Sequence, residues 1–447
     1  MLNTAGLSLQ QAPPISIPLR FFLTAPLFGL AAGVLLLAYG DVSLVSRWLP
    51  STLAATHLLT VGFLAMVMCG AMLQMLPVMA GSPVPRVKLV GSVVHALLSL
   101  GTALLAGGFL TGSSAILLGA IGCLGLGFAV FVVATGVALY RVAQAHAATA
   151  GMKLAVAALV MTVALGSMAA ASYTGIGGTG TLRFLADVHL VWGLMGWVGL
   201  LLMSVSFQLI PMFQVTAEYP RWLTWWLPRG VFLAMILWLV YGLSVPNTPE
   251  RLASTLIIGV IAVLLVTFSL FTLMLLRRRK RRIVDSTLMF WWVGMVSMPL
   301  LALFWATGYF VPFLADSPEF SMVLGVGLIF GIGYPLVNGM LYKIVPFLSW
   351  FHLQNRQLAL MCLTVNIPHM KEFVSDRASR GQFYSYLVTL LLALLAVWNP
   401  GWLVRPAALM LISTNLLLII NLVRAVYRFR SAYRQLSEMS AASVGIR

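Results

Sequence analysis

The histidines are the residues whose type and spacing point most directly to chemistry. His57 lies 20 residues before Pro77, and His189 lies 22 residues before Pro211, in similar apolar surroundings. Two neutral imidazoles at matching places on neighbouring helices are suitable ligands for haem iron or copper. The alternative is a structural role in which each imidazole donates a hydrogen bond to a backbone carbonyl. The sequence alone leaves both roles open for His57 and His189.

The remaining four histidines lack such a partner. His95 falls in the inner half of an apolar segment, and the other three fall in cytoplasmic segments, where we expect solvated or helix-capping residues. We assign none of these four a ligand role: His95, His146, His352 and His369.

Methionines recur in the segment 53–80 at steps of four, three and four residues, which places them along one face of a helix. Thioether sulfur is a ligand that suits Cu(I), so this face predicts a copper path. Ordinary helix packing is the alternative, because methionine is common in apolar cores. The methionines of this face are Met68, Met72, Met75 and Met79.

The ten carboxylates all fall in predicted loops or at predicted helix ends. A proton relay across the membrane needs ionisable groups inside it, so a carboxylate relay is not expected. The three cysteines are far apart in the sequence and form no CxxC or CxxCH motif, which argues against a disulfide framework and a covalent haem. No catalytic residue is predicted.

These residues must be positioned by membrane helices. Of the 447 residues, 61% are hydrophobic and 8% charged, whereas about 25% are charged in a soluble domain. A bilayer core needs about 20 apolar residues per helix. We therefore predict an all-α polytopic membrane protein, one transmembrane domain over 1–447, with twelve helices. They are expected at 20–40, 53–80, 89–110, 113–140, 153–174, 185–213, 223–243, 252–276, 286–313, 320–347, 383–398 and 402–425.

Basic residues gather in alternate loops, including the run RRRKRR at 277–282. The positive-inside rule places these loops and both termini in the cytoplasm, as expected for a bacterial-type inner membrane. The run is then a cytoplasmic stop between helices, with anionic lipid as an alternative partner. Without interleaved aromatic residues or a soluble module, nucleic-acid binding is not expected. The outer side carries only Arg47, Arg183, Arg251 and Arg405.

A short motif recurs at the ends of three predicted helices as QMLPV, QLIPM and KIVPF. Its prolines, Pro77, Pro211 and Pro346, are 134 and 135 residues apart, and each interval contains four predicted helices. We therefore expect three pseudo-symmetric four-helix arcs around a pseudo-threefold axis. The repeats are approximately 20–142, 152–277 and 285–427.

The segment HLLTVGFLAMVMCGAMLQMLP resembles the first histidine helix of the NnrS family, whose architecture is similar to haem-copper oxidase subunit I. His57, Gly62, Phe63, Gly70 and Pro77 match its spacing, and HLVWGLMGWVG, which begins at His189, resembles the second histidine helix. The resemblance implies haem b, copper or both, bound near the outer face. It also implies a role in nitric oxide response or respiratory-complex maintenance, with respiratory or denitrification membrane proteins as partners.

The chain departs from the oxidase pattern. The segment 223–243 has no histidine pair for a copper centre, and 320–347 has no histidine at all. A functional terminal oxidase is therefore not expected, and enzymatic activity stays open. The alternative function is a permease for a small solute or Cu(I) on the same scaffold without a redox cofactor.

Overall fold

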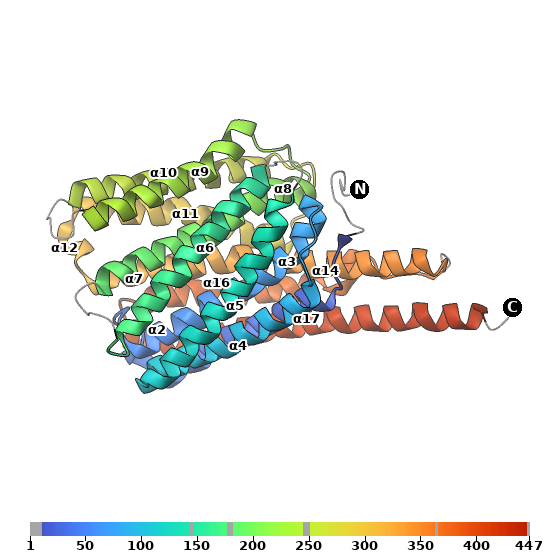
Figure 1. Ribbon diagram of the computed structural model, residues 1–447, viewed down its shortest axis with the longest axis horizontal. Coiled ribbons are helices and arrows are strands. Elements are labelled where there is room, and N and C mark those ends of the chain that lie inside the picture. Colours follow the sequence, from blue (N-terminus) through green and yellow to red (C-terminus); the bar gives the residue numbers. More distant parts are fainter. Residues whose placement is uncertain (1–10, 143–146, 177–181, 245–250, 363–364, 445–447) are drawn as a thin grey trace.

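The computed structural model describes residues 11–142, 147–176, 182–244, 251–362 and 365–444. Every regular element in these ranges is a helix, and eleven helices are long and apolar enough to cross a membrane. In hydrocarbon each backbone N–H and C=O has to be bonded within its own segment, which these helices achieve. The chain is therefore a multi-pass membrane protein whose helices run side by side (Figure 1).

Three of the spans contain a π-helical segment that interrupts the α-helix, each with at least one glycine. A π turn inserts an extra residue, and such segments are frequent at functional sites. The three spans are α2 (Pro50–His57), η3 (Leu58–Ala65) and α3 (Met66–Ala80); α7 (Leu182–Leu190), η5 (Val191–Leu200) and α8 (Leu201–Gln214); and α13 (Pro318–Val326), η6 (Gly327–Gly333) and α14 (Tyr334–Ala359).

The same three spans form the interior of the protein. In their most apolar 18 residues, 83%, 61% and 72% of the positions are buried, against at most 44% in each of the other eight spans. We call them the first, second and third central spans, in chain order. A helix that is apolar on all sides and buried on all sides belongs to the core of a bundle.

Ring contacts join the central spans in all three pairs. His57 and His189 join the first to the second, with ring centres 6.2 Å apart. Phe213 packs on Phe347 of the third central span at 5.8 Å. Tyr334 of that span also stacks on Phe63 of the first at 4.5 Å. The three central spans therefore meet around a common centre.

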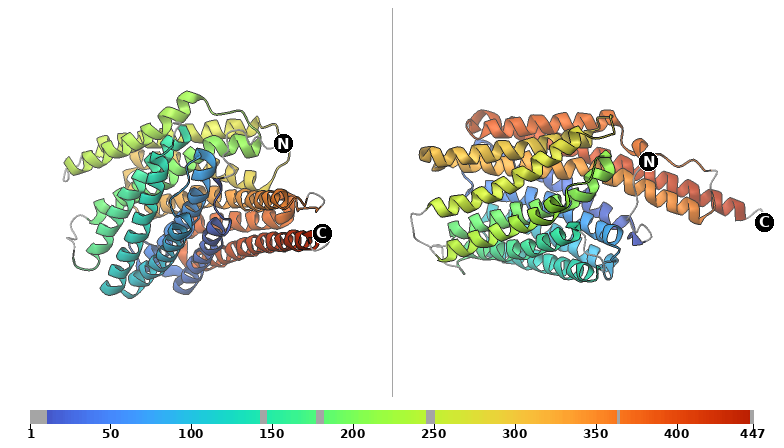
Figure 2. Two further views of the ribbon diagram at one scale, coloured as in Figure 1. Left: turned by 45° about the vertical axis from the view of Figure 1, so that its right-hand side comes forward. Right: turned by 90° about the horizontal axis from the view of Figure 1, so that it is seen from above.

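The outer helices surround this centre (Figure 2). They carry many exposed apolar side chains, as contact with lipid requires. Successive helices α4 and α5, α9 and α10, and α16 and α17 pack as neighbours. The outer helices are α1 (Ser16–Tyr39), α4 (Val87–Thr111), α5 (Ser114–Tyr140), α6 (Ala147–Ser172), α9 (Arg221–Ser244), α10 (Arg251–Arg277), α11 (Ser286–Phe310), α16 (Asp376–Ala396) and α17 (Pro400–Val444).

Two glycines singled out in the first central span allow α1 to approach closely. A Cβ at Gly62 would lie 2.5 Å from the Phe28 ring, and one at Gly70 would lie 2.6 Å from the Phe21 Cβ. Neither distance is sterically possible, so a larger residue would push α1 away. Close helix packing is thus one use of the glycines in this helix.

The largest differences from the predicted helix ends are at three places. The helix expected at 383–398 is α16, which begins at Asp376 and ends at Ala396, and it is not among the eleven apolar spans because its first turns are polar. The helices expected to end at 347 and 425 continue as α14 to Ala359 and as α17 to Val444. Polar residues continue these helices beyond their apolar parts. A prediction from the length of apolar stretches does not include such residues. The start of α1 and the ends of α14 and α17 lie at the same end of the molecule (Figure 1).

Candidate functional site

His57 and His189 face one another across the interface between the first and second central spans. Their ring centres are 6.2 Å apart, and their planes are inclined by 19°. His57 is the last residue of α2, directly before the π segment η3, and His189 lies two residues before η5. The predicted pair is therefore brought together, next to the two helix irregularities of this interface.

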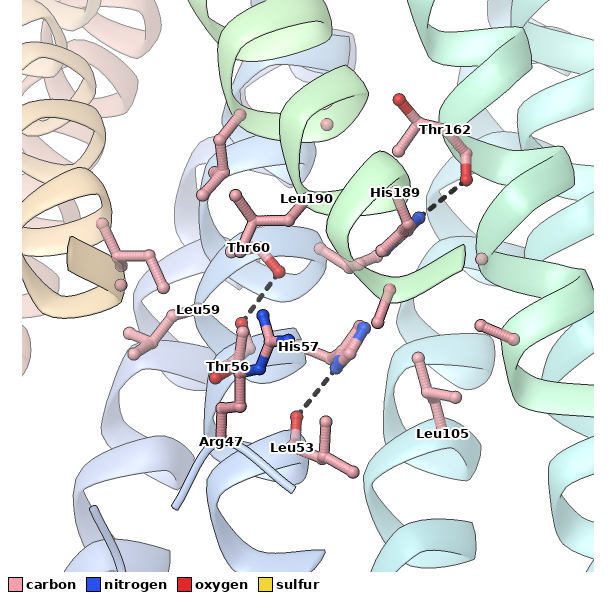
Figure 3. A pocket seen from close by; sticks show the side chains of 18 of the residues that line it. Arg47, Leu53, Thr56, His57, Leu59, Thr60, Leu105, Thr162, His189 and Leu190 are labelled. Atoms are coloured by element: carbon pink, nitrogen blue, oxygen red, sulfur yellow. Dashed lines mark hydrogen bonds between the residues drawn. The ribbon is translucent and has the colours of Figure 1, made fainter. Parts of the chain in front are cut away.

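Backbone carbonyls hold both rings in one orientation (Figure 3). His57 Nδ1 lies 2.8 Å from the Leu53 carbonyl oxygen, and His189 Nδ1 lies 2.9 Å from the Thr162 carbonyl oxygen. A carbonyl oxygen only accepts, so each Nδ1 carries the hydrogen and donates it. In a neutral ring the Nε2 then keeps its lone pair, and within the described residues neither Nε2 has a hydrogen-bond partner.

Both rings line a cavity of about 310 Å³. The lining is mostly apolar and comes from all three central spans, with Leu59, Leu194 and Phe330 as examples. The few polar groups include the hydroxyls of Thr60 and Thr162, and each hydroxyl donates within its own helix. An apolar cavity of this size with a few convergent polar groups is typical of a ligand or cofactor site.

An ion pair joins the loop before the first central span to the second central span. Arg47, in the loop before α2, lines the cavity, and its guanidinium contacts the Asp187 carboxylate at 2.5 Å. Both side chains are partly exposed, at 27% and 39%. An arginine at the rim of an apolar cavity is placed to attract the anionic end of an otherwise apolar molecule.

No family model matches this chain. No curated protein matches it either. Function therefore has to be inferred from the geometry of the site.

The donor set around the two histidines is small. Within the described residues, no group of three or more His, Cys, Asp or Glu side chains is close enough to hold a metal ion. The methionine face of the first central span lies elsewhere, because its members are buried in the core and do not line the cavity. Its role as a copper path stays a prediction for Met68, Met72, Met75 and Met79.

The other histidines lie apart from the site. His95 Nε2 is bonded to the Thr24 hydroxyl at 2.9 Å. His369 caps the short helix α15 (Met370–Phe373), which confirms its expected capping role. His352 was expected next to a cytoplasmic segment after the helix, but it lies inside the longer α14 and is half-buried. His146 lies outside the described residues.

Sequence reasoning missed the pairing of Arg47 with Asp187 and the buried ion pair between Lys343 of α14 and Asp285, the N-cap of α11. The sequence did contain a signal for the Lys343–Asp285 pair. Lys343 stands at the position of the short proline motif that is Gln74 and Gln208 in the other two copies. A cation in an apolar helix requires a partner.

Proposed function

We propose that this protein holds one haem iron or copper ion between His57 and His189, near the outer face of the membrane. The observation that carries the proposal is the geometry of the pair. Both rings are fixed through Nδ1, neither Nε2 has a hydrogen-bond partner among the described residues, and both rings line one cavity. Hydrogen bonding of the second ring nitrogen to a carbonyl is the usual arrangement for a metal-binding histidine.

The separation of the rings agrees with two ligands on one metal. A ligating imidazole nitrogen lies about 2.0–2.1 Å from the metal and about 1.1 Å from its own ring centre, so two opposed rings have centres about 6.3 Å apart. The ring centres of His57 and His189 are 6.2 Å apart. The distance between the ring centres therefore matches that of two imidazoles opposed across one metal.

The donor set favours haem over a bare copper ion. Iron in haem has four ligands from the macrocycle and needs two axial ligands from the protein. Copper(II) prefers four ligands in a tetragonal arrangement, and the described residues offer only two at this place. The mostly apolar cavity and Arg47 at its rim also suit a flat apolar molecule with anionic substituents.

A haem bound here would supply one-electron oxidation and reduction. The chain's own contribution is to hold His57 and His189 in one tautomer, to exclude water with apolar side chains and to place the Arg47 charge at the rim. A haem iron held by these two imidazoles would supply electron transfer or sensing rather than oxygen reduction. A link to nitric oxide response or to respiratory-complex maintenance, with membrane proteins of those systems as partners, is what the family resemblance adds.

We also propose the twelve-helix, three-arc scaffold for this chain. The three π segments support it, because each begins 19 or 20 residues before Pro77, Pro211 or Pro346. The 21 residues of α16 extend about 31 Å, enough for a twelfth crossing of the bilayer core. An even number of crossings leaves the two ends of the chain on the same side, which the basic loops identify as the cytoplasm.

The test is the absorption spectrum and metal content of the full-length protein purified from membranes of a haem-producing host. A Soret band in the wild-type protein that is lost in His57→Ala and in His189→Ala is expected. His369→Ala, which removes an exposed capping histidine, is the matched control and should keep the band. A wild-type protein with no Soret band and no stoichiometric copper would rule out the cofactor and leave the permease as the better explanation.

A further inference from the structure

A second cavity lies at the opposite end of the molecule from the histidine pair. It is an open groove of about 670 Å³ between the last turns of α14 and residues 429–434 of α17. Both helices continue here beyond their predicted ends at 347 and 425 (Figure 1). Three arginines line it, Arg356 from α14 and Arg430 and Arg434 from α17. Among the described residues that line the groove there is no carboxylate.

The arginines of the groove have no acidic partner. Within the described residues none of the three forms an ion pair, including with Glu438, one turn beyond Arg434. Arg356 packs over the Tyr433 ring at 5.4 Å, and its buried Nε has no hydrogen-bond partner. Three guanidinium groups around one hollow, with donors left over, fit an anion with several oxygen acceptors.

A fourth nitrogen in the same groove has no partner. His352, on α14 one turn before Arg356, has a buried Nε2 that finds no hydrogen-bond partner in the part of the chain that the structure describes. A buried polar atom without a partner is rare, and it indicates a group that a bound molecule or water satisfies. His352 lines the groove with the arginines, so one bound anion can satisfy several of these donors.

The basic run at 277–282 offers a useful contrast, because several of its arginines are already engaged. Arg279 donates to the Leu276 carbonyl, Arg281 lies 3.6 Å from the Asp285 carboxylate, and Arg277 packs over Trp292. The groove differs from the run in that, within the described residues, none of its arginines is paired with a carboxylate. The run was expected to be a cytoplasmic stop, with anionic lipid as an alternative partner, and we place the lipid in the groove.

The depth of the groove indicates the source of the anion. Ile15 and Ser16 also line it, and Ser16 is the first residue of α1, the first membrane span. The groove is therefore level with the cytoplasmic end of a span, where phospholipid headgroups lie. Its apolar residues, Ile15 and Phe429, suit the glycerol and upper acyl region of a lipid.

We propose that this groove binds the phosphate of an anionic phospholipid of the cytoplasmic leaflet, through Arg356, Arg430, Arg434 and His352. Such binding would tie the extended ends of α14 and α17 to the membrane surface. The proposal is independent of the cofactor at His57 and His189.

The test is native mass spectrometry of the delipidated full-length protein, titrated with phosphatidylglycerol. The variant R356Q/R430Q/R434Q should bind about tenfold or more weakly than the wild type, since each arginine near an anionic surface contributes severalfold to affinity. The matched control is R377Q/R424Q/R428Q, which removes the same charge from exposed arginines that do not line the groove. It should bind as the wild type does. If the triple variant does not fold, R430Q/R434Q replaces it in the titration, because this variant alters only exposed side chains.

Three other results would contradict the proposal, and each points to a different explanation. Equal weakening in the groove variant and the control would indicate general attraction to basic charge. Equal binding of phosphatidylcholine would show that the anionic headgroup is not recognised. Displacement of the lipid by millimolar glycerol 3-phosphate or inorganic phosphate, with the same dependence on the three arginines, would identify a soluble phosphate compound as the ligand.

Discussion

The Lys343 ammonium lies 2.6 Å from the Asp285 carboxylate, and both side chains are almost fully buried. Asp285 also accepts from the Leu288 backbone N–H as the N-cap of α11, and it lies 3.6 Å from Arg281. The pair therefore joins α11 to α14 of the third central span. When one member of a buried ion pair has a second partner nearby, substituting the two members costs unequal amounts of folding stability.

Asp285→Asn should destabilise the protein more than Lys343→Met does. The first change leaves a buried lysine without a partner, at a cost of about 3–5 kcal/mol. The second leaves Asp285 its contact with Arg281 and its capping bond, so the loss is smaller. Thermal unfolding of both variants in detergent checks the order. Asp41→Asn is the control, because Asp41 is exposed in the short 3₁₀ helix η2 (Gly40–Val42). An equal loss in both variants would mean that Arg281 does not compensate.

Stability should fall with acidification in a way that depends on Asp285. Burial acts to raise the pKa of this carboxyl, but attraction and hydrogen bonding from Lys343, with the Leu288 N–H and Arg281, hold the pKa below its ordinary value. A group whose pKa is lower in the folded state stabilises that state above the unfolded pKa, about 3.9 for Asp. The contribution is lost as pH falls through the folded pKa.

Unfolding midpoints measured from pH 7 to pH 3 therefore test the pair. The wild type should lose stability below about pH 4 more steeply than Asp285→Asn, in which the carboxyl is absent. Parallel curves for the two proteins would show that Asp285 has no altered pKa in the folded state.

Gly166→Ala should displace the His189 ring while both proposed ligand residues remain histidines. A Cβ at Gly166 would lie 2.7 Å from His189 Cε1 and 3.0 Å from Nδ1, so the ring has to move. Loss of the orientation of a ligand lowers metal affinity by about 10–100-fold. Cofactor content per protein, read from absorbance and metal analysis, measures the effect. Gly125→Ala is the matched control, because nothing lies within 4 Å of its added Cβ.

Gln382→Ala should cost more stability than Asn338→Ala. Gln382 of α16 accepts from Asn338 at 3.2 Å and from Tyr342 at 3.3 Å, and it donates to the Thr414 hydroxyl at 3.0 Å. Asn338 makes only the first of these bonds. A bond of this kind within a membrane contributes about 0.6 kcal/mol on average. Thermal unfolding of both variants checks this, and a larger loss in Asn338→Ala would contradict the network described.

Asn338 shows how far a single sequence position can be interpreted. A polar amide in an apolar helix predicts a bond across a helix interface, and the bond to Gln382 confirms it. The partner was not predictable, because Gln382 is 44 residues away and follows the arginine-rich start of α16. The π segments were also missed, since an apolar run of even composition does not reveal an inserted residue.

The sequence by itself determined that this is a membrane protein of long apolar helices, and it singled out His57 and His189. Those properties are local: hydropathy, charge and spacing are carried by neighbouring residues along the chain. Only the tertiary structure decided that the two imidazoles share a cavity and that Arg47 meets Asp187 across 140 residues. It also decided that Arg356 meets Arg430 and Arg434 around a groove. These contacts depend on how helices distant in sequence pack against one another, and the shapes of the side chains at each interface control that packing.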